Sequence, residues 1–186
     1  MVPVLSLWLP ILVSAVIVFA ASSIIHMMLG YHDNDYRRFP KEDDLLDALR
    51  PLGLQPGDYA APHAGGSAGM KNPAFLEKMN KGPVVVMTVM PSGPPAMGGA
   101  LAMWFVYIVV VSVFAAYVTG RAVGPGVSYL EVFRFAGTSA FMAYSFAVVP
   151  QSIWYKRQWS TTCKSVVDGL VYGLLTAGVF GWLWPR

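Results

Sequence analysis

Long runs of apolar residues, separated by polar segments, make up most of this chain. The first run, residues 4–29, carries no charge apart from the one that His26 can take. A helix needs about 20 apolar residues to cross a bilayer core, and it satisfies its backbone polar groups internally, as lipid requires. No Lys or Arg precedes the run, and it is longer than the apolar core of a signal peptide. We therefore expect a retained membrane-spanning helix.

Three further apolar runs predict the remaining spans. In the second of them, Ser128 and Glu131 have the spacing of a capping box at a helix start. Pro150 lies near the end of the same run and predicts a kink, or the end of its membrane portion. The predicted fold is an all-α membrane protein, a bundle of four transmembrane helices. The expected spans are residues 4–29, 99–120, 128–154 and 161–184.

A polar segment, residues 31–98, separates the first two spans. Capping and stop signals predict short helices over 39–53 and 72–82. The β-branched run at 83–90 predicts a strand, and 57–62 is a candidate partner strand. We therefore expect a small α/β insertion between the first and second spans. About 50 structured residues bury little surface alone, so this insertion should lean on the membrane surface or on a partner.

The composition agrees with a membrane protein and argues against nucleic acid as a partner. Hydrophobic residues make up 55% of the chain and charged residues 12%, about half the usual charged share. Residues 31–98 hold seven Lys or Arg and eight Asp or Glu, so the net charge of +3 describes no basic face. No basic cluster with interleaved aromatics is present, which argues against nucleic acid. The expected partners are the lipid bilayer and either a second copy of the chain or a subunit of a membrane complex.

The distribution of Lys and Arg near the span ends predicts an orientation. The insertion and the link between the third and fourth spans must lie on the same side of the membrane. That side carries more Lys and Arg near the span ends than the side with the two termini. Because cytoplasmic loops collect positive charge, we expect residues 31–98 in the cytoplasm and both termini on the opposite side.

The end of the first span, "HMMLGYHDNDYRR", concentrates groups that bind metals or protons. His26, His32, Asp33 and Asp35 fall within ten positions, and Gly30 could break the helix and return His32 towards His26. Imidazole and carboxylate groups ligate hard or borderline cations. His32, Asp33 and Asp35 could therefore bind one, with His63 as a distant fourth ligand. The alternative is a polar collar, in which these side chains are solvated at the membrane surface. The collar is the commoner arrangement for such a pattern.

The ionisable residues within the other spans all lie near span ends. Glu131 and Arg134 are three positions apart and Lys164 and Asp168 are four apart, so each pair can form an ion pair on one helix. Asp168 precedes a long uncharged stretch and needs a cationic partner, either Lys164 or a basic residue across the preceding turn. No ionisable residue lies near mid-membrane, which argues against a proton-driven transporter.

Small residues recur every four positions along the last span. A strip of this kind lets another helix approach closely. The neighbouring helix could belong to the same bundle, to a second copy of the chain or to a partner subunit. The strip consists of Ser165, Gly169, Gly173, Ala177 and Gly181.

Three segments of the chain resemble a family of small, uncharacterised bacterial inner-membrane proteins. They are "IWYKRQWSTTCKSVVDGLVYGLLTAGVFGWLWP" (153–185), "DYRRFPKEDDLLDALR" (35–50) and "GPPAMGGALAMWFVY" (93–107). The resemblance covers most of the chain and implies a bacterial source and a stand-alone multi-pass protein of the cytoplasmic membrane. In such a membrane the charge distribution above predicts that both termini lie in the periplasm. No activity, cofactor or catalytic residue comes with it.

Motifs for common enzyme classes are missing from the sequence. It contains no nucleophile elbow, phosphate-binding loop, haem-attachment motif or zinc-protease helix. We therefore expect a non-enzymatic accessory or scaffolding component of the membrane. The alternative is a site for a metal, lipid headgroup or small solute at the end of the first span, in a transporter or an enzyme.

Overall fold

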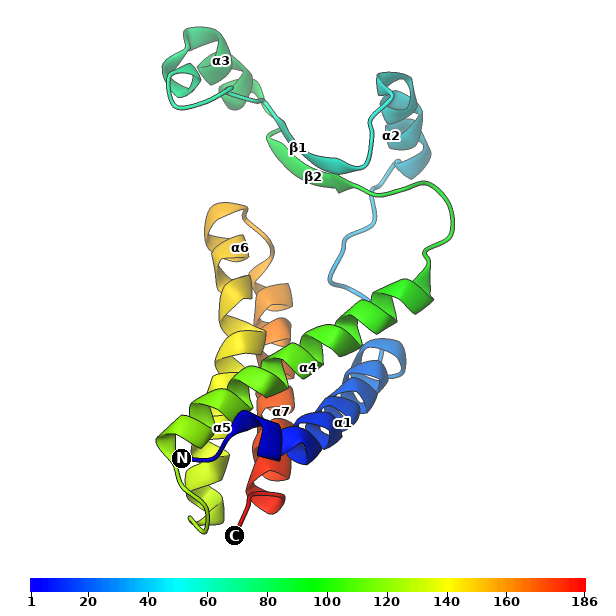
Figure 1. The fold of residues 1–186 in the computed structure, drawn as a ribbon. Coiled ribbons are helices and arrows are strands. Elements are labelled where there is room, and N and C mark those ends of the chain that lie inside the picture. Colours follow the sequence, from blue (N-terminus) through cyan, green and yellow to red (C-terminus); the bar gives the residue numbers. More distant parts are fainter. The chain divides into compact units, whose positions relative to one another are not determined.

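The computed structural model describes all 186 residues, arranged in two units. Residues 1–37 and 96–186 form the first unit, which contains four helices long and apolar enough to cross a membrane (Figure 1). The chain is therefore a multi-pass membrane protein, and the predicted fold class is confirmed. The first span, Val4–Met27, consists of a 3-10 turn (Val4–Leu7) and α1 (Trp8–Met27), and the second span is α4 (Met97–Ala122). The third span, Tyr129–Trp154, consists of α5 (Tyr129–Ser145), a 3-10 turn (Phe146–Val148) and α6 (Val149–Trp154). The fourth span is α7 (Trp159–Trp182).

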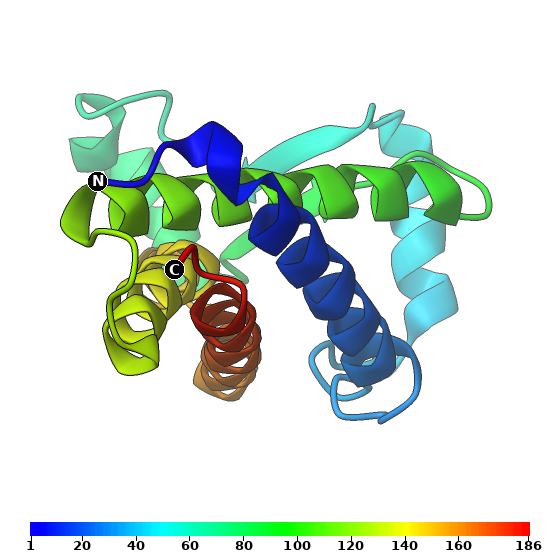
Figure 2. The same ribbon diagram turned by 60° about the horizontal axis from the view of Figure 1, so that its bottom comes forward.

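The four spans form a bundle in which each span packs mainly against two neighbours. The contacts run from α1 to α4, from α4 to α5, from α5 to α7 and from α7 back to α1. Helices α5 and α7 lie side by side, whereas α4 crosses α5 obliquely (Figure 2). Two clusters of buried apolar side chains fill the interior, one containing Leu7 and Phe180 and the other Val18 and Ile108. Apolar packing thus extends along most of the bundle.

The start of the third span and the interruption near its end follow the sequence signals. The Ser128 amide donates to Glu131 Oε2 at 3.1 Å, and the Glu131 amide donates to Ser128 Oγ at 3.4 Å, so the predicted capping box is confirmed. Pro150 has no N–H to donate to the carbonyl of Phe146, and its ring would clash with that carbonyl in a regular helix. The helix is interrupted there by the 3-10 turn between α5 and α6, as the proline predicted.

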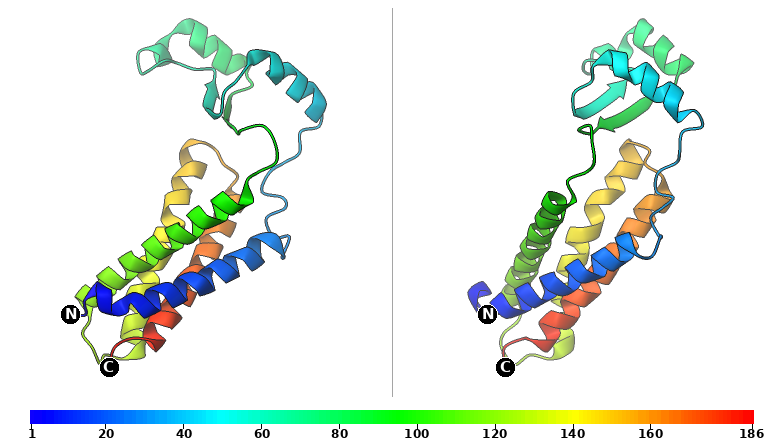
Figure 3. Two further views of the ribbon diagram at one scale, coloured as in Figure 1. Left: turned by 45° about the vertical axis from the view of Figure 1, so that its right-hand side comes forward. Right: turned by 90° about the vertical axis from the view of Figure 1, so that its right-hand side faces the viewer.

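Residues 38–95 form the second unit, which is the predicted α/β insertion. Its two strands pair antiparallel, with Tyr59 opposite Met87, and Figure 3 shows them together with the two helices of the unit. The Asn72 side chain accepts the Ala74 amide at 2.9 Å and caps the second of these helices, as expected. The elements are α2 (Glu42–Leu49), β1 (Gly57–Ala61), α3 (Pro73–Lys81) and β2 (Val85–Val89).

Candidate functional site

The chain reverses direction directly after α1. Gly30 has a φ of +59°, in the left-handed region that glycine adopts without strain, and it turns the backbone back towards the bundle. The Lys164 ammonium of α7 then holds the returning segment, because it donates to the Tyr31 carbonyl at 2.7 Å and to Asn34 Oδ1 at 2.5 Å. The turn places the His32 ring against His26, with ring centroids 4.3 Å apart. The expectation that Gly30 returns His32 towards His26 is therefore met.

His32 stands between two carboxylates. Its Nδ1 lies 2.7 Å from Asp35 Oδ2 and its Nε2 lies 3.0 Å from Asp168 Oδ2. Since an ionised carboxylate only accepts hydrogen bonds, Nδ1 donates to Asp35. Nε2 is buried and lies within ion-pair distance of Asp168, and no hydrogen bond of good geometry reaches it. We call His26, His32, Asp35 and Asp168 the His–Asp cluster.

Lys164 compensates the charge of only one of the two carboxylates. Its ammonium lies 2.9 Å from Asp35 Oδ1. Burial opposes the ionisation of Asp35, but the hydrogen bonds from Lys164 and His32 outweigh it and hold the pKa of Asp35 below its ordinary value. Asp168 is only 5% exposed and has no Lys or Arg within ion-pair distance.

The expected pair between Lys164 and Asp168 is thus replaced by two others, Lys164 with Asp35 and His32 with Asp168. Lys164 lies one helical turn nearer the start of α7, and long cationic side chains extend towards the membrane surface. Its ammonium therefore meets the segment that follows α1. Two alternative partners lie across the turn, Lys156 and Arg157. Lys156 donates instead to the carbonyl of Ile153 at 2.9 Å, and Arg157 forms no ion pair with Asp168.

Three members of the cluster could hold a metal ion. One ligand atom from each of His26, His32 and Asp168 lies within 4.8 Å of the other two. Ligands of a tetrahedral zinc ion, bound at about 2.0–2.2 Å, lie about 3.3–3.6 Å apart, so small side-chain shifts would suffice. The contact from His32 Nδ1 to Asp35 is the outer contact that orients metal-bound histidines in proteins.

Tyr172 of α7 adds a further polar group to the site. Its hydroxyl lies 3.3 Å from His26 Nε2, and its ring is buried among the apolar side chains of the bundle. The site therefore has a hydroxyl at its inner side and a carboxylate, Asp35, at its outer side.

The structure places the sequence-predicted ligands in different roles. Asp33 is exposed and its carboxylate turns towards Gly30, away from the converging ligand atoms. Asp35 contacts His32 but does not belong to the three-residue ligand group. Asp168 takes the place of these aspartates. The sequence contains a signal for it, a short acidic side chain before a long uncharged stretch, but this signal indicated Lys or Arg as the partner and not histidine.

The other predicted ion pair does not form. The Glu131 carboxylate accepts from the Ser128 amide and hydroxyl, and no ion pair joins it to Arg134. Because the cap already uses the carboxylate, Arg134 has no acidic partner.

The strip of small residues on α7 faces α5 of the same chain. A Cβ atom added to Gly173 would lie 3.0 Å from Phe141 Cβ, and one added to Gly181 would lie 2.6 Å from the Tyr129 ring. One added to Gly169 would lie 2.1 Å from the Ser145 hydroxyl. The close approach that the strip predicted is therefore made within the bundle.

Comparison with protein-family models, curated proteins and solved structures finds no match. The His–Asp cluster is therefore the feature on which a function for this protein can be based.

Proposed function

We propose that this multi-pass membrane protein binds a divalent transition-metal ion, such as Zn²⁺, through His26, His32 and Asp168. The observation that carries the proposal is the buried carboxylate of Asp168, whose charged neighbours include no Lys or Arg. An uncompensated buried carboxylate is costly. A divalent cation would supply positive charge at the point where the three ligand atoms converge.

The tautomer of His32 agrees with metal binding. Because Nδ1 donates to Asp35, a neutral His32 presents a lone pair at Nε2, the atom that lacks a hydrogen-bond partner. Neutral imidazole and carboxylate are ligands that zinc accepts, and three protein ligands leave a fourth position for water or a solute. The competing arrangement is a protonated His32 that bridges the two carboxylates as a structural clamp.

The scaffolding role suggested by the small-residue strip has less support. The strip lies against α5 of the same chain, so it is not available to a second copy or a partner subunit. The metal site is therefore the function that the geometry favours.

The test compares the metal content of purified full-length protein with that of single variants. Wild-type protein loaded with Zn²⁺ should retain about one ion per chain after desalting, and His32→Gln or Asp168→Asn should retain little. Asp35→Asn, which removes the carboxylate that contacts His32 Nδ1 and pairs with Lys164, should weaken binding about 10–100-fold. His63→Gln is the matched control, because His63 is exposed and lies in the second unit, and it should bind as wild type does.

Metal content also separates the metal site from the clamp. Equal and negligible zinc in wild type and His32→Gln would refute the proposal. If His32→Gln then also lowers the unfolding temperature, the clamp is the better interpretation. Co²⁺ provides a second readout, since tetrahedral coordination by nitrogen and oxygen ligands gives visible absorption that the Asp168→Asn variant should lose.

We also propose that the protein resides in a bacterial cytoplasmic membrane, with the second unit in the cytoplasm and both termini in the periplasm. The support is the resemblance described above and the excess of Lys and Arg near the span ends on the side of the insertion. Ser67→Cys in a Cys163→Ser background gives one exposed thiol in the second unit. A membrane-impermeant maleimide should label it only after the inner membrane is opened. Labelling in intact spheroplasts would show the opposite orientation and contradict the proposal.

A further inference from the structure

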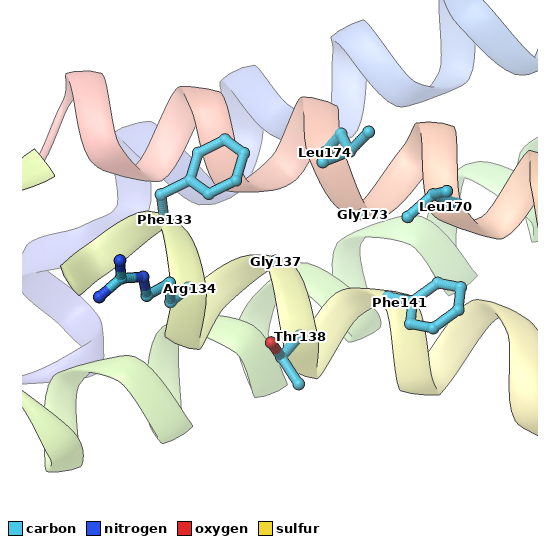
Figure 4. Close-up of a pocket in the computed structure, with 8 residues that line it drawn as sticks. All are labelled: Phe133, Arg134, Gly137, Thr138, Phe141, Leu170, Gly173 and Leu174. Carbon is cyan, nitrogen blue, oxygen red and sulfur yellow. The ribbon is translucent and has the colours of Figure 1, made fainter. Parts of the chain in front are cut away.

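A shallow apolar hollow lies on the outer face of the bundle, between α5 and α7 (Figure 4). Its volume is about 210 Å³. Gly137 and Gly173 lie at its floor, where the two helices approach closely, and aromatic and leucine side chains line it. Because both helices are membrane spans, the surroundings of this hollow are lipid rather than water. The aromatic and leucine side chains are Phe133, Phe141, Leu170 and Leu174.

Arg134 lies at one end of the hollow (Figure 4). It is exposed, and it forms neither an ion pair nor a side-chain hydrogen bond, because Glu131 is occupied by the helix cap. Arg134 is five residues after the start of α5 at Tyr129, or about 7.5 Å along the helix. From this depth an arginine side chain can extend to the level of the phospholipid phosphates.

We propose that the hollow binds one anionic phospholipid, with its phosphate on Arg134 and part of one acyl chain over Gly137 and Gly173. Charge complementarity identifies the headgroup, since the unpaired guanidinium matches the planar geometry of two phosphate oxygens. The apolar lining identifies the chain. A cavity of about 150 Å³ holds a benzene molecule, so this hollow accommodates a short length of hydrocarbon.

A neighbouring helix fits the hollow less well than a lipid chain. Helices associate in membranes along extended strips, whereas the hollow covers only about two turns of α5. The small residues of α7 beyond it are covered, Gly181 by Tyr129 and Gly169 by Ser145. A lipid needs only the short apolar surface and the charge at its end.

The test measures lipid binding to the purified full-length protein in detergent. Phosphatidylglycerol should raise the unfolding temperature more than phosphatidylcholine at the same concentration, and it should be retained in native mass spectra. Arg134→Gln should bind phosphatidylglycerol about fivefold more weakly, the effect of one basic residue beside an anionic lipid surface. Arg121→Gln is the matched control, because that guanidinium already stacks on Tyr117.

A second variant tests the hollow independently of the charge. Thr138 is exposed and lines the hollow, so Thr138→Phe should fill part of it without disturbing the bundle, and should reduce retention of both lipids. Equal binding of phosphatidylglycerol by wild type and Arg134→Gln would overturn the proposal. So would an identical temperature shift with inorganic phosphate alone, because the site would then recognise a free anion and not a lipid.

Discussion

The contact between α5 and α7 makes a sharp prediction at Gly173. A Cβ atom added there would lie 3.0 Å from Phe141 Cβ, 3.1 Å from the Phe141 amide nitrogen and 3.2 Å from the Gly137 carbonyl oxygen. Two of these three atoms are backbone, so no change of rotamer relieves the crowding. Non-bonded carbon atoms pack at about 3.5–4.0 Å, and the two helices would have to separate by about half an ångström or more.

Gly178 provides the comparison on the same helix. A Cβ atom added there would meet only the Tyr129 hydroxyl, at 3.7 Å, which is ordinary contact. Alanine stabilises a helix interior by about 0.5–1 kcal/mol relative to glycine, and both substitutions share this gain. Overpacking costs about 1–3 kcal/mol, so we expect Gly173→Ala to unfold more easily than Gly178→Ala by about that amount.

Unfolding in mixed micelles, with helicity followed by circular dichroism while the fraction of a denaturing detergent is increased, measures this difference. Gly178→Ala should be as stable as wild type or more stable. If Gly173→Ala matches Gly178→Ala, the two helices do not approach as closely as described, and the geometry of the hollow beside them would also be wrong.

Two smaller predictions concern hydrogen bonds. Ser128→Ala should destabilise the protein by about 1 kcal/mol in the same assay and Ser128→Gly by only a few tenths, because glycine is tolerated at helix N-caps and alanine is not; equal losses would argue against the cap. The hydroxyls of Ser14 and Ser112 lie 3.1 Å apart in the bundle interior, and a double-mutant cycle with alanine should give a coupling of about 0.6 kcal/mol, the average for such bonds in a membrane bundle. A coupling of zero would show that each hydroxyl is satisfied by its own helix.

Much of the fold could be predicted because its signals are local. The lengths of the apolar runs define the spans. The capping box at Ser128 defines the start of the third span, and the proline at position 150 defines the interruption near its end. In the insertion, Asn72 and Gly82 begin and end α3 as their residue types indicate. Each of these features depends on residues within a few positions of one another.

The candidate site was only half predictable because it joins distant segments. The sequence indicated His26 and His32, whose approach depends on the turn at Gly30. It gave no means of choosing among the nearby carboxylates. The third ligand is contributed by α7, and the packing of α1 against α7, which brings Asp168 to the histidines, has no local signature.

Depth in the membrane explains why the spacing rule failed for Asp168. Residues four apart on a helix can form an ion pair, but that rule assumes similar surroundings for both side chains. Asp168 lies about 13.5 Å from the start of α7 at Trp159, and Lys164 only about 7.5 Å, so the lysine extends outwards while the short aspartate side chain cannot. Only groups at the same depth can contact this carboxylate, and the end of α1 and the turn that follows it place the two histidines there. For a buried carboxylate near a span end, histidines at the end of a neighbouring span are therefore more suitable partners than a lysine one turn nearer the surface.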